Sequence, residues 1–116
     1  MKVLVTGATG FVGGHTAALL TRSGHDAVAL VRDPHKLQSS MRALDAEVAS
    51  VVVGDMTDRS AVDAALDQVE AVVHCAAVVS LARRDEARML ADNLAGFDAV
   101  VGGAVRRELD PVVHVS

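Results

Sequence analysis

The sequence predicts a doubly wound α/β domain, in which five parallel strands in the order 3-2-1-4-5 carry helices on both faces. Short β-branched segments alternate with segments of helical period along the whole chain of 116 residues. That alternation is typical of a parallel sheet with right-handed crossovers. A glycine-rich turn follows the first β segment at once, and the length suits one domain with one core.

The β segments are short and rich in β-branched residues, as in strands buried in a parallel sheet. Strands are expected over residues 2–6, 26–31, 47–53, 71–74 and 112–115. Helices are expected over residues 11–22, 34–44 and 84–109, and a further helix follows a cap at Thr57 and Asp58. Asp33 before Pro34 is expected to cap the second helix. In the last helix, the residues predicted to face the sheet are Leu90, Leu94, Phe97, Val101, Ala104 and Val105.

Composition excludes several classes of protein. With 11 basic and 15 acidic residues the formal charge is −4, so no nucleic-acid partner is expected. The longest apolar runs, such as residues 75–79, fall far short of the ~20 residues that a membrane helix needs. The N-terminus lacks a signal peptide's apolar core, so a cytoplasmic protein is expected. The lone Cys75 excludes an internal disulfide, and the five histidines lack metal-ligand spacing, so no metal is predicted.

Three glycines between the first strand and the first helix form a GxxGxxG pattern. Gly7 is expected to make the tight turn, and Gly13 to let the helix pack closely on the strand. Gly10 would let a diphosphate approach the backbone amides of Phe11 and Val12 at the helix N-terminus. The pattern, placed between a strand and a helix, predicts dinucleotide binding. The alternative is a glycine-rich turn without a ligand.

Six motifs follow one another along the chain: TGATGFVGG, GHDAVALVRDP, VVVGDMTD, AVVHCAA, DNLAG and PVVHVS. In this combination the chain resembles, over its whole length, the extended short-chain dehydrogenases/reductases. This is the family of NAD(P)-dependent epimerases, dehydratases and reductases. The resemblance implies a Rossmann-like fold and selects no particular substrate, because the family's substrate pocket is built largely from later segments.

The choice of cofactor rests on the residues after the second strand. Where NAD-preferring members carry a carboxylate for the adenosine ribose, this chain has Val31, and Arg32 follows. A guanidinium there could pair with the 2′-phosphate of NADP, so NADP is favoured and NAD is the alternative. In that alternative Arg32 is a solvated cation, and the Asp33 carboxylate accepts hydrogen bonds from the adenosine ribose.

The resemblance implies further cofactor contacts after strands three and four. Asp55 matches the carboxylate that receives the adenine amino group, with the backbone of Met56 beside the ring; Asp55 could instead belong to the following helix cap. Ala76 and Ala77 match small residues that line the cofactor's diphosphate and ribose. Cys75 beside them is interpreted as an inert, small apolar residue.

The resemblance also concerns the catalytic residues. Asn93 matches the Asn of the family's N-x-x-G and is expected to support the floor of the site. The family's catalytic Ser and Tyr-x-x-x-Lys perform acid–base chemistry. This sequence contains no Tyr, its lysines are Lys2 and Lys36, and Ser116 matches only the start of the family's Ser-rich segment. No catalytic residue is therefore assigned.

The sequence thus predicts one domain over residues 1–116, the dinucleotide-binding portion of such an enzyme, truncated after strand five and inactive alone. The alternatives are a stand-alone NAD(P)-sensing or interaction module and a split enzyme completed in trans. With two helices on each face, strands four and five lack cover on the first-helix face, which is expected to be apolar and exposed. Strand five would be an open edge, through which the chain is expected to self-associate or to be completed by a partner.

Overall fold

The computed structural model describes residues 1–76 and 83–115 of the chain. Its centre is a five-stranded parallel sheet with the order β3-β2-β1-β4-β5, which confirms the predicted fold class and strand order. The strands are β1 (Lys2–Thr6), β2 (Asp26–Val31), β3 (Ser50–Val53), β4 (Ala71–His74) and β5 (Val112–His114). The register pairs Thr6 with Leu30 and with His74, so the carboxyl ends of β1, β2 and β4 lie together.

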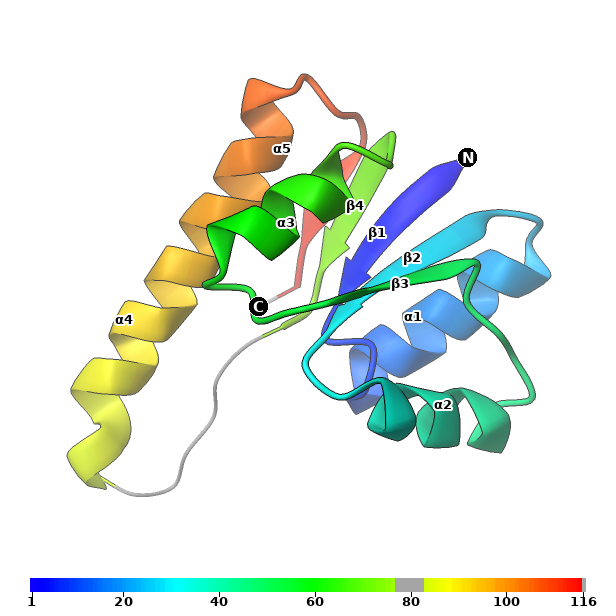
Figure 1. Ribbon diagram of the computed structural model, residues 1–116, viewed down its shortest axis with the longest axis horizontal. Helices are drawn as coiled ribbons and strands as arrows, with labels where there is room; N and C mark the ends of the chain where they lie inside the picture. The colour runs from blue at the N-terminus through cyan, green and yellow to red at the C-terminus, as the bar shows by residue number, and fades with distance from the viewer. Residues whose placement is uncertain (77–82, 116) are drawn as a thin grey trace.

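Helices cover both faces of the sheet (Figure 1). One face carries α1 (Phe11–Arg22) and α2 (Pro34–Ala43), and the other carries α3 (Arg59–Leu66), α4 (Glu86–Phe97) and α5 (Gly103–Arg106). A 3-10 turn, η1 (Arg83–Asp85), precedes α4, and a π-helical turn, η2 (Asp98–Gly102), joins α4 to α5. No helix in the described ranges is long and apolar enough to cross a membrane.

Side chains that alternate along the strands divide the core into two layers. The layer beneath α1 and α2 contains Val5, Ala17, Ala27, Ala29, Val31, Leu37 and Met41. The layer beneath α3 to α5 contains Leu4, Val28, Leu30, Met56, Val62, Leu66, Val72 and Val100. Both faces of the sheet are therefore buried at its centre, as the apolar β segments predicted.

The predicted orientation of the last helix is wrong. Leu90 and Leu94 are each 60% exposed, and Phe97 and Val105 are also exposed. Of the six residues predicted to face the sheet, Ala104 is buried as expected. The other buried residues of this segment are mostly small: Gly96, Ala99, Val100 and Gly103. A Cβ atom on Gly103 would lie 2.6 Å from Cδ1 of Leu66 in α3. The two helices can therefore approach this closely only where the facing side chains of the last helix are small. Two stripes of helical period run along this segment, and the less hydrophobic one packs inward.

The third strand begins later than predicted, at Ser50 rather than at residue 47. The backbone before it is held by α1, because the hydroxyl of Thr21 donates a hydrogen bond of 2.8 Å to the carbonyl oxygen of Glu47. Pairing with β2 starts only where the N–H of Ala49 donates to the carbonyl of Ala27, at 2.8 Å.

The apolar exposure expected on the α1 side is found at β5, whereas Val73 of β4 is half-buried. Val113 of β5 pairs in register with Val73, which pairs with Val5 of the α1 layer. Val5 is fully buried, whereas Val113 is 45% exposed and Val115 is also exposed. Because β5 is the last strand in the sheet order, no strand within residues 1–76 and 83–115 pairs with its outer edge.

Candidate functional site

A cleft of about 230 Å³ lies at the carboxyl ends of the strands. Four separate chain segments line it: Thr6, Gly7, Thr9 and Gly10 after β1, Leu30 to Arg32 at the end of β2, Gly54 to Met56 after β3, and Cys75 with Ala76 after β4. The strand order reverses between β1 and β4, and ligands of open α/β sheets bind at such a point. Six of the predicted site residues therefore meet in one cleft: Gly7, Gly10, Arg32, Asp55, Met56 and Ala76.

The glycines of the turn perform different tasks. Gly7 has φ +71°, and a Cβ atom there would lie 2.8 Å from the amide nitrogen of Ala76. A Cβ atom on Gly13 would lie 2.1 Å from the carbonyl oxygen of Gly7. Both glycines are thus required by contacts within the chain. At Gly10 the nearest atom, the carbonyl oxygen of Gly7, would be 3.4 Å away, so the chain's own packing requires glycine there much less strongly.

The first helix begins directly after Gly10, its N-cap residue. The first N–H groups of a helix have no partner within the helix, and its dipole makes this end partly positive. Neither a capping side chain at Gly10 nor an acidic side chain in the first turn of α1 neutralises this end. Phe11 and Val12 do not line the cleft, and their side chains are 81% and 48% exposed.

Thr6 is a site residue that the sequence interpretation missed. Its buried Oγ1 accepts hydrogen bonds from the backbone N–H of Cys75 at 3.0 Å and of Ala76 at 3.1 Å. It also lies 2.7 Å from Nδ1 of His74. One hydroxyl therefore joins the glycine turn after β1 to the end of β4. The available signal in the sequence was that a polar residue, Thr6, follows the apolar residues 3–5 and stands directly before Gly7.

His74 and Cys75 are both shifted by burial. Burial, with a smaller contribution from the neighbouring His114 imidazole, lowers the pKa of His74 to about 4. The two rings stack with their centroids 5.5 Å apart. Burial raises the pKa of the Cys75 thiol, against the opposing effect of a hydrogen bond with Thr16. The thiol form is thereby favoured, in keeping with the inert role expected for Cys75.

Arg32 and Asp55 face each other across the end of the cleft formed by β2 and β3. Nη1 of Arg32 lies 3.9 Å from Oδ2 of Asp55, and the Arg32 side chain is 79% exposed. Oδ1 of Asp55 accepts the backbone N–H of Thr57 at 3.1 Å and its hydroxyl at 3.2 Å. Asp33 instead caps α2, as predicted, by accepting the N–H groups of His35 and Lys36.

Two further predicted residues, Gly13 and Asn93, are not part of the cleft lining. Gly13 is buried beneath the turn, and Asn93 is half-buried on α4. Ala77 and Ser116 fall outside the described residues. Within residues 1–76 and 83–115, no group of three or more His, Cys, Asp or Glu side chains is placed to hold a metal ion.

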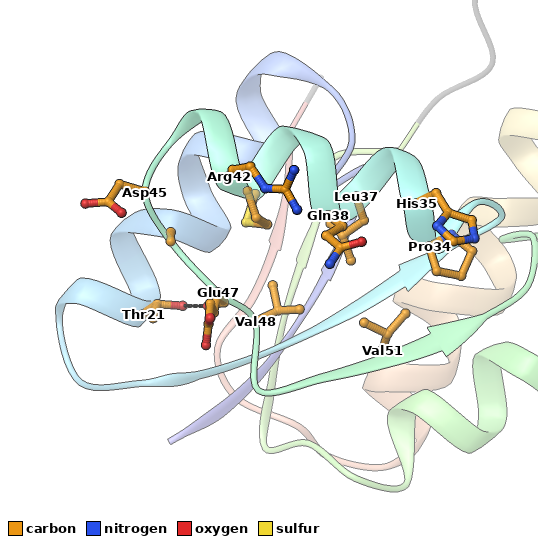
Figure 2. A pocket seen from close by; sticks show the side chains of 12 residues that line it. Thr21, Pro34, His35, Leu37, Gln38, Arg42, Asp45, Glu47, Val48 and Val51 are labelled. Atoms are coloured by element: carbon orange, nitrogen blue, oxygen red, sulfur yellow. Dashed lines mark hydrogen bonds between the residues drawn. The ribbon is translucent and has the colours of Figure 1, made fainter.

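A larger hollow of about 900 Å³ lies elsewhere, between α2 and β3 (Figure 2). Leu37, Met41, Val48 and Val51 contribute apolar surface to it, and the Thr21–Glu47 hydrogen bond closes one end. It contains none of the predicted site residues and no glycine turn. The smaller cleft is therefore the candidate functional site.

The strand order and the glycine turn define a Rossmann-like domain. More narrowly, the chain belongs to the NAD dependent epimerase/dehydratase family, whose family model matches residues 3–116. It is 34% identical over 116 residues to sterol demethylase protein B of Methylococcus capsulatus, covering 100% of this chain and 34% of that protein. It is 30% identical over 124 residues to the dTDP-glucose 4,6-dehydratase of Streptomyces antibioticus, covering 100% of this chain and 37% of the relative.

Solved structures show the same relationship. A short-chain dehydrogenase/reductase superfamily protein from Agrobacterium tumefaciens with bound NAD superimposes with a TM-score of 0.82 at 28% identity, over 100% of this chain and 32% of that one. The UDP-glucose-4-epimerase of Stenotrophomonas maltophila with bound NAD gives a TM-score of 0.82 at 25% identity, over 98% of this chain and 36% of that one. The chain thus spans about a third of the length of these relatives.

Proposed function

We propose that the chain binds an adenine dinucleotide, NAD or NADP, in the cleft at the carboxyl ends of β1 to β4. The observation that carries the proposal is the difference between the three glycines of the turn. Gly7 and Gly13 are required by contacts within the chain, whereas a Cβ atom at Gly10, directly before the first N–H groups of α1, would meet only the carbonyl oxygen of Gly7, at 3.4 Å. A diphosphate needs that combination of bare backbone and partial positive charge.

The residues of the cleft fit the other parts of such a cofactor. Leu30, Val31 and Met56 offer apolar surface, and Asp55 a hydrogen-bond acceptor, at the end formed by β2 and β3. An adenosine needs such surface for its base and an acceptor for its amino group. Because Oδ1 of Asp55 is engaged by Thr57, Oδ2 is the proposed acceptor for adenine. When bound, the cofactor would supply hydride transfer chemistry.

We further propose that the chain prefers NADP. The end of β2 carries Val31 where a ribose-binding carboxylate would be needed for NAD, and Asp33 is engaged as the cap of α2. The exposed Arg32 guanidinium stands at the rim of the cleft and can turn toward a 2′-phosphate, with which it would form charge-assisted hydrogen bonds.

The wider role proposed for the chain is to supply the cofactor-binding part of an NAD(P)-dependent oxidoreductase or epimerase. The resemblance assigns proton transfer to a Tyr, and these 116 residues contain none. We therefore expect the chain by itself to bind the dinucleotide without turning over a substrate.

Isothermal titration of the chain with NADP and with NAD tests both proposals. We expect saturable binding of each, tighter for NADP, and we expect Arg32→Ala to weaken NADP about tenfold while leaving NAD nearly unchanged. Arg88→Ala is the matched control, because Arg88 is also highly exposed and also lies 3.9 Å from a carboxylate, that of Asp92, but on α4. Absence of binding heat with both cofactors would overturn dinucleotide binding. An equal loss for NADP and NAD in Arg32→Ala would overturn the 2′-phosphate contact.

A further inference from the structure

We infer that Gly96 of α4 is a positioning residue for the adenine end of the cleft and that it acts through the side chain of Met56. The inference rests on the proposed binding of an adenine dinucleotide. Gly96 does not line the cleft; it lies behind Met56, on the side of the helices.

Met56 lies at the boundary between the cleft and the hydrophobic core. It lines the cleft directly after Asp55, yet it is only 7% exposed and belongs to the core layer between the sheet and α3 to α5. Met56 therefore takes part in both the cleft lining and the core layer, and we take its thioether as the part that separates the two. Methionine side chains are flexible, so the position of the Met56 side chain depends on the residue that packs against it from the side of the helices.

Gly96 of α4 is the residue that packs against the Met56 side chain from the side of the helices. A Cβ atom on Gly96 would lie 2.4 Å from Sδ, 2.7 Å from Cγ and 3.0 Å from Cε of Met56, which are its three nearest atoms. Contacts this short do not persist, so a methyl group at residue 96 must displace the Met56 side chain. Other members of the same core layer, such as Val62 and Val100, are fully buried, so the displacement is expected to be toward the cleft that Met56 lines.

The missing side chain at Gly96 thus sets the depth of the cleft at the proposed adenine position. Displacement of Met56 toward the cleft would occupy the space of the base and leave the diphosphate turn unchanged. Gly96 is also the glycine of the N-x-x-G motif, whose Asn93, three residues earlier, is half-buried and does not line the cleft.

Titration of Gly96→Ala with NAD, with ADP and with nicotinamide mononucleotide tests the inference. We expect about tenfold weaker binding of NAD and ADP, the two probes that contain adenine, and no change for nicotinamide mononucleotide. Gly102→Ala is the matched control, since it adds the same methyl group to the same continuous helical segment. Its new Cβ atom would meet only the ends of Arg106 and Asp98, each at 3.1 Å. It should bind all three probes within twofold of the original chain.

A double-mutant cycle separates positioning from general damage to the helix. In a Met56→Ala chain the thioether is gone, so adding Gly96→Ala should change the affinity for ADP less than twofold. A tenfold loss in that background too would overturn the inference, as would unchanged ADP binding by Gly96→Ala alone. If Gly96→Ala fails to fold, restored folding in the double variant supports the contact, and continued unfolding counts against it.

Methyl NMR measures the position of Met56 without any ligand. The sequence contains four methionines, so the Met56 methyl resonance is readily assigned by substitution. We expect Gly96→Ala to shift it and Gly102→Ala to leave it in place; an unshifted resonance in Gly96→Ala overturns the inference even where no nucleotide binds. Failure of the original chain to bind NAD or ADP, with the shift present, would instead count against the proposed function alone.

Discussion

The hydroxyl of Thr6 and Nδ1 of His74 lie 2.7 Å apart at the buried ends of β1 and β4. Oγ1 of Thr6 also accepts the N–H groups of Cys75 and Ala76, which occupy both of its lone pairs. Its own proton is therefore donated to His74, and Nδ1 must carry no proton. The hydrogen-bond network thus assigns a neutral imidazole protonated at Nε2, in agreement with a pKa lowered to about 4.

We expect the free energy of unfolding to fall as the pH drops from 6.5 toward 4. In the unfolded chain His74 takes up a proton near its ordinary pKa of 6.5, whereas in the folded chain it resists until about pH 4. The unfolded state binds more protons in this window, so acid favours it, by roughly 3 kcal/mol over the whole window. Urea unfolding at several pH values measures the slope.

The variants His74→Leu and His35→Gln assign that slope to one residue. His74→Leu should flatten the dependence between pH 6.5 and 4, although its stability at pH 7.5 is reduced by the lost hydrogen bond. His35 is exposed, and His35→Gln should keep the original slope. The same slope in both variants would contradict the neutral assignment of His74.

Alanine substitutions in the glycine turn should separate folding from binding. Gly13→Ala places a methyl group 2.1 Å from the carbonyl oxygen of Gly7, so we expect severe destabilisation, seen as a Tm lowered by ten degrees or more. Gly10→Ala meets its nearest atom at 3.4 Å, so the fold should survive. Its methyl group would stand in the proposed place of the diphosphate, and dinucleotide affinity should fall at least tenfold. Equal effects of both substitutions on Tm would speak against this division.

Arg107 should hold α3 against the segment that follows α5. Its Nη2 lies 3.2 Å from Oδ1 of Asp63, its Nε lies 3.1 Å from Oδ1 of Asp67, and the side chain is only 29% exposed. Arg107→Met keeps the apolar stem and removes both ion pairs, so we expect a loss of about 1 kcal/mol in the free energy of unfolding. Arg88→Met, which removes a pair of 3.9 Å at a side chain 86% exposed, should change it very little. Chemical denaturation in low and high salt tests the pair of variants.

Self-association through β5 remains a prediction, and the exposed valines make it testable. Sedimentation velocity should show concentration-dependent association of the chain, reduced by Val113→Lys, because a charge on an open edge strand opposes pairing. Val51→Lys is the control at the opposite edge, where a similarly exposed valine faces the hollow beside α2. A monomer at all concentrations, or an equal effect of both substitutions, would rule out association through β5.

The parts of this molecule that local sequence determines were predictable. Each strand is a short β-branched run, the spacing of Gly7, Gly10 and Gly13 marks the turn, and Asp33 before Pro34 marks a helix cap. The strand order followed from the doubly wound arrangement typical of alternating β and α segments. The orientation of the last helix was not predictable, because its buried side is chosen by volume: Gly96 and Gly103 accommodate Met56 and Leu66, which lie far away in the sequence.

The residues that line the cleft were likewise predictable only where a local motif marks them. Gly10 was predicted from the glycine pattern and Asp55 from the family resemblance, and both line the cleft because the carboxyl ends of parallel strands meet at one edge of the sheet. Thr6 was missed because its partners, the amides of Cys75 and Ala76, are almost 70 residues away in the chain. A single threonine in a strand carries no sign of such partners until β4 is placed beside β1.

The cleft draws its walls from four segments between Thr6 and Ala76, so no fragment of one or two strands contains it. A dinucleotide would therefore bind only the folded chain, in which all four segments are in place. Its binding would be linked thermodynamically to folding. At a free concentration one hundred times the Kd, the ligand would add about 2.7 kcal/mol to the free energy of unfolding. The folded population of the chain would then rise with the free concentration of the dinucleotide.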